Sequence, residues 1–177
     1  MSRSPQQGAR QIGGNGVDIP EAPEPVQLFV AAPMASVGAR TYARNNAQII
    51  TLVKGLQREL SLSPIYYAGM ALPRSRDFED EALALRNNLS ALAASRRFVL
   101  IYPRPLPTSA LIELGYAMAM KIPARIFVRD WKHLPFMLRS ATRVCPEIAI
   151  LRYRTLDDVL ALLREEREFL ALGVGTA

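Results

Sequence analysis

Five short apolar runs, each followed by a stretch of helical periodicity, constrain the fold of this chain more than any other feature. Continuous apolar runs of this length are typical of strands that are buried on both faces of a parallel sheet. Strand then helix, repeated five times, predicts a doubly wound α/β domain with a five-stranded parallel sheet and helices on both faces. The predicted strands span residues 26–32, 64–68, 97–102, 124–128 and 147–151, and the predicted helices span residues 41–60, 77–94, 109–120, 134–140 and 155–170.

The ends of the chain differ from this regular pattern. Residues 1–24 are polar and rich in glycine, too poor in apolar residues to offset the entropy of ordering, so we predict a disordered tail. We expect residues 25–171 to form a single domain and residues 172–177 to be a flexible C-terminus. No segment resembles a signal peptide, and no apolar run reaches the roughly 18 residues that span a bilayer. With Cys145 as its single cysteine, the chain is predicted to be cytoplasmic, with no membrane association and no multi-cysteine metal site.

Positive charge is the second feature of the composition. The 22 basic residues give a net charge of +6, and all but Lys54, Lys121 and Lys132 are arginines. Arginine suits phosphate and carboxylate groups, so anionic partners are favoured, although a compositional habit of the source genome would explain the excess equally well. Arg74 and Arg76, in the loop after the second predicted strand, are candidates to hold a substrate phosphate, or are solvated surface charges. No pattern of a nucleic-acid-binding fold is found, so a nucleic acid partner is not expected.

Glu113 is the strongest candidate for a catalytic residue. It is the single charge in the segment TSALIELGYAMAM, which is apolar nearly all round and should therefore be largely buried. A buried carboxylate is costly unless it is paired or hydrogen-bonded. The segment follows the third predicted strand, at the edge of the sheet where doubly wound domains bind ligands. Glu113 could act there as a nucleophile or stabilise a developing cation, or else lie at a solvent-exposed rim or in a structural ion pair.

Two segments resemble nucleoside 2-deoxyribosyltransferases. LFVAAPM (Leu28–Met34) is similar to the first strand and loop of that family, and ELGYAMAMKIPARIFV (Glu113–Val128) is similar to its Glu-Leu-Gly-x-Ala helix and the strand that follows. The resemblance implies a flavodoxin-like core. It also implies that Glu113 is the nucleophile that attacks the anomeric carbon of the sugar, with Phe29 orienting it and Pro33 near the substrate.

Two features depart from the transferase pattern. The loop PRPLPTS has no carboxylate where that family usually carries an aspartate, and Asn87 and Asn88 stand in the region where an aspartate holds the base. We therefore expect Asn88 to contact the substrate, and we favour hydrolysis over transfer.

The segment ASRRFVLIYP (Ala94–Pro103) resembles a different family, the Toll/interleukin-1 receptor (TIR) domains. That resemblance implies the same flavodoxin-like core, with Ser109 and Glu113 in the positions that serve the NAD-cleaving members. Ser109 precedes Glu113 by four residues with no aromatic residue between them, which departs from the usual TIR spacing. TIR domains often assemble with one another, so the resemblance also implies a homo-oligomer.

These observations lead to two hypotheses of different classes. The first is an enzyme that cleaves the N-glycosidic bond of NAD or of a nucleoside or nucleotide at Glu113. It would need no cofactor and no metal, since NAD would be a substrate and not a cofactor, and a deoxyribosyltransferase is the alternative enzyme. The second is a non-catalytic TIR-like interaction module, whose contact surfaces would be Met70–Arg76 and Leu134–Ser140. His133, the single histidine, is better explained as a surface residue than as a metal ligand or general base.

Overall fold

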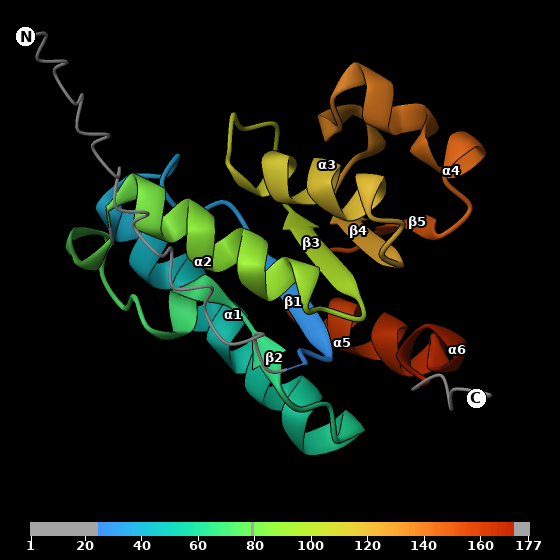
Figure 1. The fold of residues 1–177 in the computed structure, drawn as a ribbon, viewed down its shortest axis with the longest axis horizontal. Helices are drawn as coiled ribbons and strands as arrows, with labels where there is room; N and C mark the ends of the chain where they lie inside the picture. Colours follow the sequence, from blue (N-terminus) through green and yellow to red (C-terminus); the bar gives the residue numbers. More distant parts are fainter. Residues whose placement is uncertain (1–24, 79, 172–177) are drawn as a thin grey trace, which may run out of the picture.

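A five-stranded parallel sheet forms the centre of the molecule, as the sequence predicts (Figure 1). The structure is a computed structural model that describes residues 25–78 and 80–171; the predicted terminal tails and the glycine-rich segment Ile12–Gly16 lie outside the described residues. The strand order is β2-β1-β3-β4-β5, which is the flavodoxin-like order. The strands are β1 (Leu28–Ala31), β2 (Ile65–Tyr66), β3 (Phe98–Tyr102), β4 (Ala124–Val128) and β5 (Ile148–Arg152).

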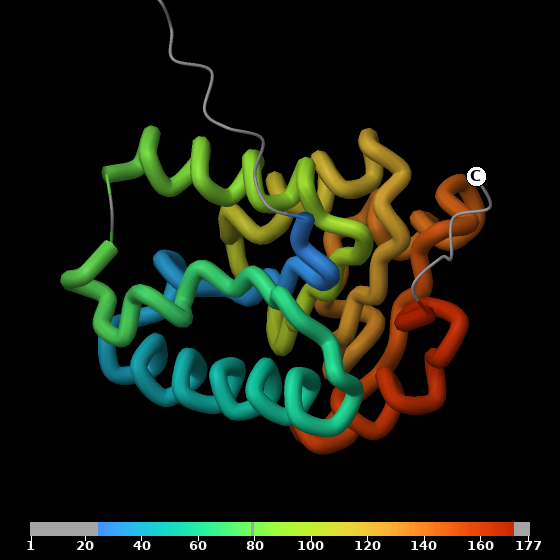
Figure 2. Tube along the Cα trace, turned by 60° about the horizontal axis from the view of Figure 1, so that its bottom comes forward, coloured from blue at the N-terminus to red at the C-terminus, as the bar shows by residue number. Residues whose placement is uncertain are grey.

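Helices cover both faces of the sheet. On one face, α1 (Ala39–Leu60) packs beside α5 (Leu156–Glu165). On the other face, α2 (Glu81–Ala93) packs beside α3 (Ala110–Ala119), and Figure 2 shows these two layers with the sheet between them. The short helices α4 (Ala141–Val144) and α6 (Arg167–Leu170) complete the two layers.

The alternation of side chains along each strand produces two separate cores. Phe29 and Phe98 point toward the α2/α3 face, where they pack with Leu114 of α3. Leu28 and Val30 point toward the α1/α5 face. Since neighbouring residues of a strand face opposite sides, a side chain at the end of a strand is committed to one face or the other.

Several helix boundaries differ from the predicted ones. Helix α2 begins at Glu81 and not at Asp77, because the side chain of Asp80 caps it by accepting hydrogen bonds from the backbone N–H groups of Ala82 and Leu83. Asp77 instead lies in a separate 3-10 helix, η2 (Ser75–Asp77). The segment predicted as one helix over 134–140 is a 3-10 helix, η4 (Phe136–Ser140), followed by α4, and the predicted last helix is divided between α5 and α6 at Glu166.

Helix α3 is less buried than its apolar sequence predicts. Its inner face is buried through Ala110, Leu114 and Ala117, but Ile112 is 60% exposed, and Met120, which caps the C-terminal end of the helix, is 53% exposed. The helix therefore has a buried face and an exposed face, but apolar side chains occur on both. No helix in the described part of the chain combines the length and apolar character needed to cross a membrane.

Candidate active site

Glu113 lies in the first turn of α3, immediately after the loop that leaves the carboxyl end of β3. Its backbone N–H donates to the carbonyl of Ser109 at 3.2 Å, so the helix fixes its position. The residue is only 8% exposed, which confirms the expected burial of this carboxylate. Glu113 thus combines a buried charge with a place at the edge of the sheet where doubly wound domains bind ligands.

Two residues, linked by hydrogen bonds, support the Glu113 carboxylate. Asn88 of α2 donates from Nδ2 to Oε1 of Glu113 at 2.8 Å. The hydroxyl of Tyr66 in β2 donates to Oδ1 of the same asparagine, also at 2.8 Å. This second bond fixes the amide so that its N–H₂ group faces the carboxylate. Among the described residues, Oε2 of Glu113 accepts no hydrogen bond, so one carboxylate oxygen is held and the other is free for chemistry.

The surroundings of Glu113 change its acidity. Burial raises the pKa of the Glu113 carboxyl from 4.5 to about 7, and the hydrogen bond from Asn88 opposes this by stabilising the ionised form. The carboxyl is therefore divided between its neutral and ionised forms near pH 7. A carboxylate with this acidity, at the edge of a sheet, is the kind of group that serves as a nucleophile or electrostatic partner.

Phe29 supports this arrangement through Tyr66. Its ring stacks on Tyr66 with centroids 4.9 Å apart and on Phe98 with centroids 5.7 Å apart. At 1% exposure the ring belongs to the core. The predicted role of Phe29 in orienting Glu113 therefore has a physical route, through the tyrosine that holds Asn88.

Sequence reasoning did not single out Tyr66. The residue belongs to the predicted second strand, and nothing in the segment PIYYA separates its two tyrosines. The signal that could have found it is the pairing of β2 with β1, which places Tyr66 directly opposite Phe29.

The other predicted site residues do not gather around the Glu113 carboxylate. Ser109 lies one turn before it and is exposed, and Thr108 supplies the side-chain oxygen that accepts from the N–H of Ala110. Pro33 is buried, but it lines a cavity on the α1/α5 face. The structure therefore brings Asn88 to Glu113 and leaves Pro33 on the opposite side of the sheet.

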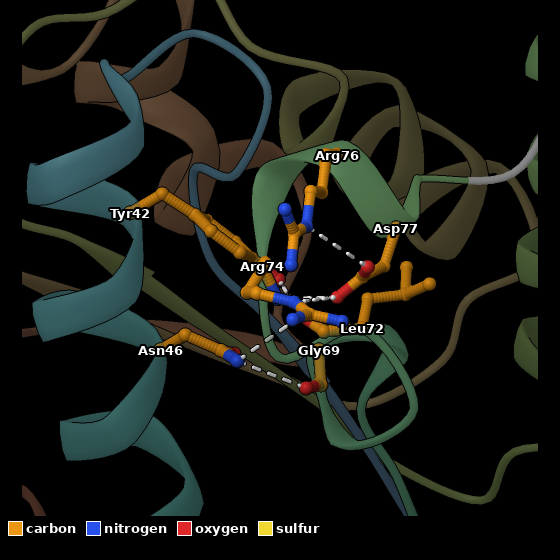
Figure 3. Close-up of polar contacts among 7 residues, drawn as sticks. All are labelled: Tyr42, Asn46, Gly69, Leu72, Arg74, Arg76 and Asp77. Carbon is orange, nitrogen blue, oxygen red and sulfur yellow. Dashed lines mark hydrogen bonds and ion pairs between the residues drawn. The ribbon is translucent and has the colours of Figure 1, made fainter.

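Arg74 and Arg76 both reach toward one carboxylate, that of Asp77, as Figure 3 shows. Arg74 pairs with Asp77 at 3.0 Å and Arg76 approaches the same residue at 4.0 Å. Both arginine side chains are more than half exposed, at 60% and 72%. Asp77 offsets part of their charge, and its pKa is lowered chiefly by its hydrogen bond with Arg74.

A cavity of about 540 Å³ lies on the α1/α5 face, and sequence reasoning did not identify it. It opens at the carboxyl edge of the sheet, between α1 and the loops that follow β1, β3 and β4. We call it the arginine cavity, because Arg44, Arg104 and Arg129 line it. Glu113 is not among its lining residues. No cluster of three or more metal-ligating side chains occurs in residues 25–78 and 80–171.

The fold and the Glu113 site together define a flavodoxin-like α/β domain with a buried carboxylate at the ligand-binding edge. Comparison of the sequence with protein families gives no match, and comparison with curated proteins gives none either. Similarity is found among solved structures. The structure of the Clostridium botulinum CMP N-glycosidase BcmB is similar with a TM-score of 0.61 and 16% identity, covering 79% of this chain and 98% of that chain. The solution structure of BlsM is similar with a TM-score of 0.64 and 13% identity, covering 89% of this chain and 100% of that chain.

Proposed function

We propose that this protein hydrolyses the N-glycosidic bond of a nucleotide, with Glu113 as the residue that meets the anomeric carbon. The observation that carries the proposal is the arrangement of the buried Glu113 carboxylate, with Oε1 held by Asn88 and Oε2 left without a hydrogen bond among the described residues. The similarity in fold to a CMP N-glycosidase adds support. CMP and NAD are the substrates to examine first.

The proposed reaction follows from the chemistry of a carboxylate beside a sugar. As the bond from C1′ to the base nitrogen breaks, its electron pair leaves with the base and positive charge develops on the ribose. The ionised Oε2 of Glu113 stabilises that charge or forms a glycosyl ester with C1′. Water then adds at C1′, displacing Oε2 where the ester has formed, and loses a proton to solvent, while the departing base takes up a proton from solvent. For CMP the products are ribose 5-phosphate and free cytosine.

The first experiment measures release of the base from CMP and from NAD by liquid chromatography. Glu113→Gln keeps the size and the hydrogen bond but removes the charge, so we expect base release to fall by at least about 100-fold. Glu165→Gln, an exposed residue of α5, is the matched control and should retain full activity. Equal rates for wild type and Glu113→Gln would reject the proposal.

A second candidate function is a TIR-like interaction module that assembles with copies of itself. The observation that favours it is the exposure of large apolar side chains in η4 and α4, where Phe136 is 85% exposed, Met137 is 84% exposed and Val144 is 77% exposed. This surface includes part of the predicted contact segment Leu134–Ser140. It also agrees with the homo-oligomer that the TIR resemblance implies.

Light scattering after size-exclusion chromatography tests this second candidate. An assembly would have a mass above the 19.6 kDa of one chain. Phe136→Ser combined with Met137→Ser should return the protein to a single chain, whereas Leu83→Ser combined with Leu85→Ser, at exposed positions of α2, should not. A wild-type protein that elutes as one chain at all concentrations would reject the module.

A further inference from the structure

The arginine cavity has the size and position of a ligand site, and the proposed function does not use it. Its volume of about 540 Å³ lies within the range of about 300–1,000 Å³ that small-molecule sites occupy. Its lining includes Pro33 after β1, Arg104 after β3 and Arg129 after β4. The cavity thus lies at the carboxyl ends of the strands, beside the β1/β3 switch point at which doubly wound sheets bind ligands.

The charge around the arginine cavity is of one sign. Arg44, Arg104 and Arg129 line it, and no aspartate or glutamate occurs among the described residues of its lining. None of these three arginines forms an ion pair within the described part of the chain. A neighbouring groove between α1 and α5 is closer to neutral, because Glu59 and Asp157 lie there beside Arg58, Arg154 and Arg129, the last of which it shares with the cavity. The excess of positive charge is therefore greater in the cavity than in the adjoining groove.

The wall of the cavity is built before any ligand arrives. Asn46 of α1 is 3% exposed, donates to the carbonyl of Gly69 at 3.0 Å and accepts from the hydroxyl of Tyr67 at 2.7 Å. A Cβ atom at Gly69 would lie 2.1 Å from Oδ1 of Asn46, so this close approach requires glycine. Figure 3 shows Asn46 reaching from α1 to this loop. A wall that is already ordered lowers the entropic cost of binding.

One of the arginines is also held in place. The guanidinium of Arg129 lies 5.9 Å from the centroid of the Tyr153 ring, and Tyr153 lines the same cavity. Arginine presents a planar fork that binds two phosphate oxygens at once. Three such groups around one cavity match a phosphate or diphosphate better than a single carboxylate.

The sheet separates the arginine cavity from Glu113. Ile101 lines the cavity and packs in the core of the α1/α5 face, whereas Glu113 bonds to Asn88 on the α2/α3 face. We propose that the arginine cavity is a binding site for a phosphorylated small molecule of nucleotide size, held through Arg44, Arg104 and Arg129 and separate from the Glu113 site. This inference does not depend on N-glycosidase activity.

Isothermal titration with inorganic pyrophosphate tests the proposal. We expect Arg104→Gln combined with Arg129→Gln to weaken pyrophosphate binding by at least about tenfold, the loss of two charge-assisted contacts. Arg86→Gln combined with Arg143→Gln removes the same charge from exposed positions outside the cavity and should weaken binding less than about twofold. Circular dichroism and melting temperature confirm that both double variants fold, since all four positions are exposed.

Titration of Glu113→Gln separates this site from the proposed active site. That variant should bind pyrophosphate as wild type does, even if base release proves to be absent in every form of the protein. CMP titrated into Glu113→Gln, with and without Arg104→Gln and Arg129→Gln, then distinguishes the ligand source: CMP binding that the two arginine substitutions weaken supports a nucleotide, and CMP binding that they leave unchanged supports a free diphosphate in the cavity. Absence of pyrophosphate binding at millimolar concentration, or equal losses in the two double variants, would overturn the proposal.

Discussion

The ionisation of Glu113 opposes folding, because its carboxyl is more acidic in the unfolded chain than in the buried site. Its pKa rises from 4.5 to about 7 on folding, so the folded protein binds more protons than the unfolded chain between these values. The stability that the neutral form provides is complete below about pH 4.5 and is lost as the pH rises through about 7. When this stability is lost completely, the free energy of unfolding falls by on the order of 3 kcal/mol.

The first prediction therefore concerns stability and not activity. Glu113→Gln cannot ionise, so its free energy of unfolding should exceed that of wild type at pH 8 and the difference should shrink toward pH 5. Urea denaturation at a series of pH values measures this difference. The prediction is wrong if the two proteins keep a constant difference in stability across that range.

Asn88 gives a second prediction at the residue scale. Its hydrogen bond lowers the pKa of Glu113, so Asn88→Leu should raise that pKa further above its value in wild type. If the ionised carboxylate is the active form, the acidic limb of the kcat/KM profile should move to higher pH. A pH titration of the ¹³C-labelled carboxyl by NMR measures the same change in pKa without an activity assay.

Tyr66→Phe serves as the graded control for this prediction. It removes only the hydroxyl that orients Asn88, so the pKa should move in the same direction by a smaller amount. An unchanged carboxyl titration in Asn88→Leu would show that burial alone sets the acidity of Glu113.

At the scale of single elements, α3 carries a glycine that its packing does not need. The small residues Gly115 and Ala117 of α3 suit close packing on the sheet, and Ala117 is completely buried there. Gly115 takes no part in such packing, because the residue is exposed and an added Cβ would meet nothing within 4 Å. The glycine therefore weakens the helix without an evident gain in packing.

We accordingly predict that Gly115→Ala stabilises the protein by about 0.5–1 kcal/mol. Gly55→Ala in α1 is the contrasting variant, because its Cβ would lie 3.2 Å from Cδ2 of Leu160 and would crowd that side chain of α5. In thermal unfolding, we expect Gly115→Ala to raise the melting temperature and Gly55→Ala to raise it less or to lower it. Destabilisation by Gly115→Ala would indicate that this face of α3 is covered by something beyond the single chain.

The elements also show what a sequence can predict and where prediction stops. Strand β4 has the predicted bounds, because its short run of apolar residues, interrupted by Arg125 alone, indicates a buried strand. Helix α2 was placed too early, because Asp77 resembles a first-turn acid but is used by the backbone and side chain of Arg74. Both Asp77 and Asp80 can cap a helix, and only the local turn geometry separates them.

The candidate site was predictable to the same extent. Glu113 stands out because a single charge in an apolar helix is a local anomaly in the sequence. The chain from Tyr66 through Asn88 does not stand out, because its members come from different elements and meet only once β2 pairs with β1 and α2 packs against α3. The arginine cavity also depends on strand order, since its arginines come from α1 and from two separate strand ends.

At the scale of the whole molecule, the strands of the sheet differ in length, pairing and burial. Strand β3 is central, pairs with β1 and β4, and has all five of its residues buried. Strand β2 has two half-buried residues and, within the described part of the chain, pairs with β1 alone. Because Tyr66 of β2 supports Asn88, the Glu113 site is anchored partly on the weakest strand of the sheet.

This inequality predicts a gradient in amide hydrogen exchange. Amides buried in a doubly paired strand exchange only through large openings, whereas a short edge strand opens locally at low cost. Peptides covering Phe98–Tyr102 and Ala124–Val128 should therefore be the most protected, and the peptide covering Ile65–Tyr66 should exchange faster. Exchange measured by mass spectrometry on wild type and on Tyr66→Phe provides the test, with the loss of the hydroxyl increasing exchange in β2 and in α2 near Asn88 but not in β4. Equal protection of β2 and β3 would mean that the edge is stabilised by a contact outside the single chain, and the dependence of the Glu113 site on a weak strand would then be wrong.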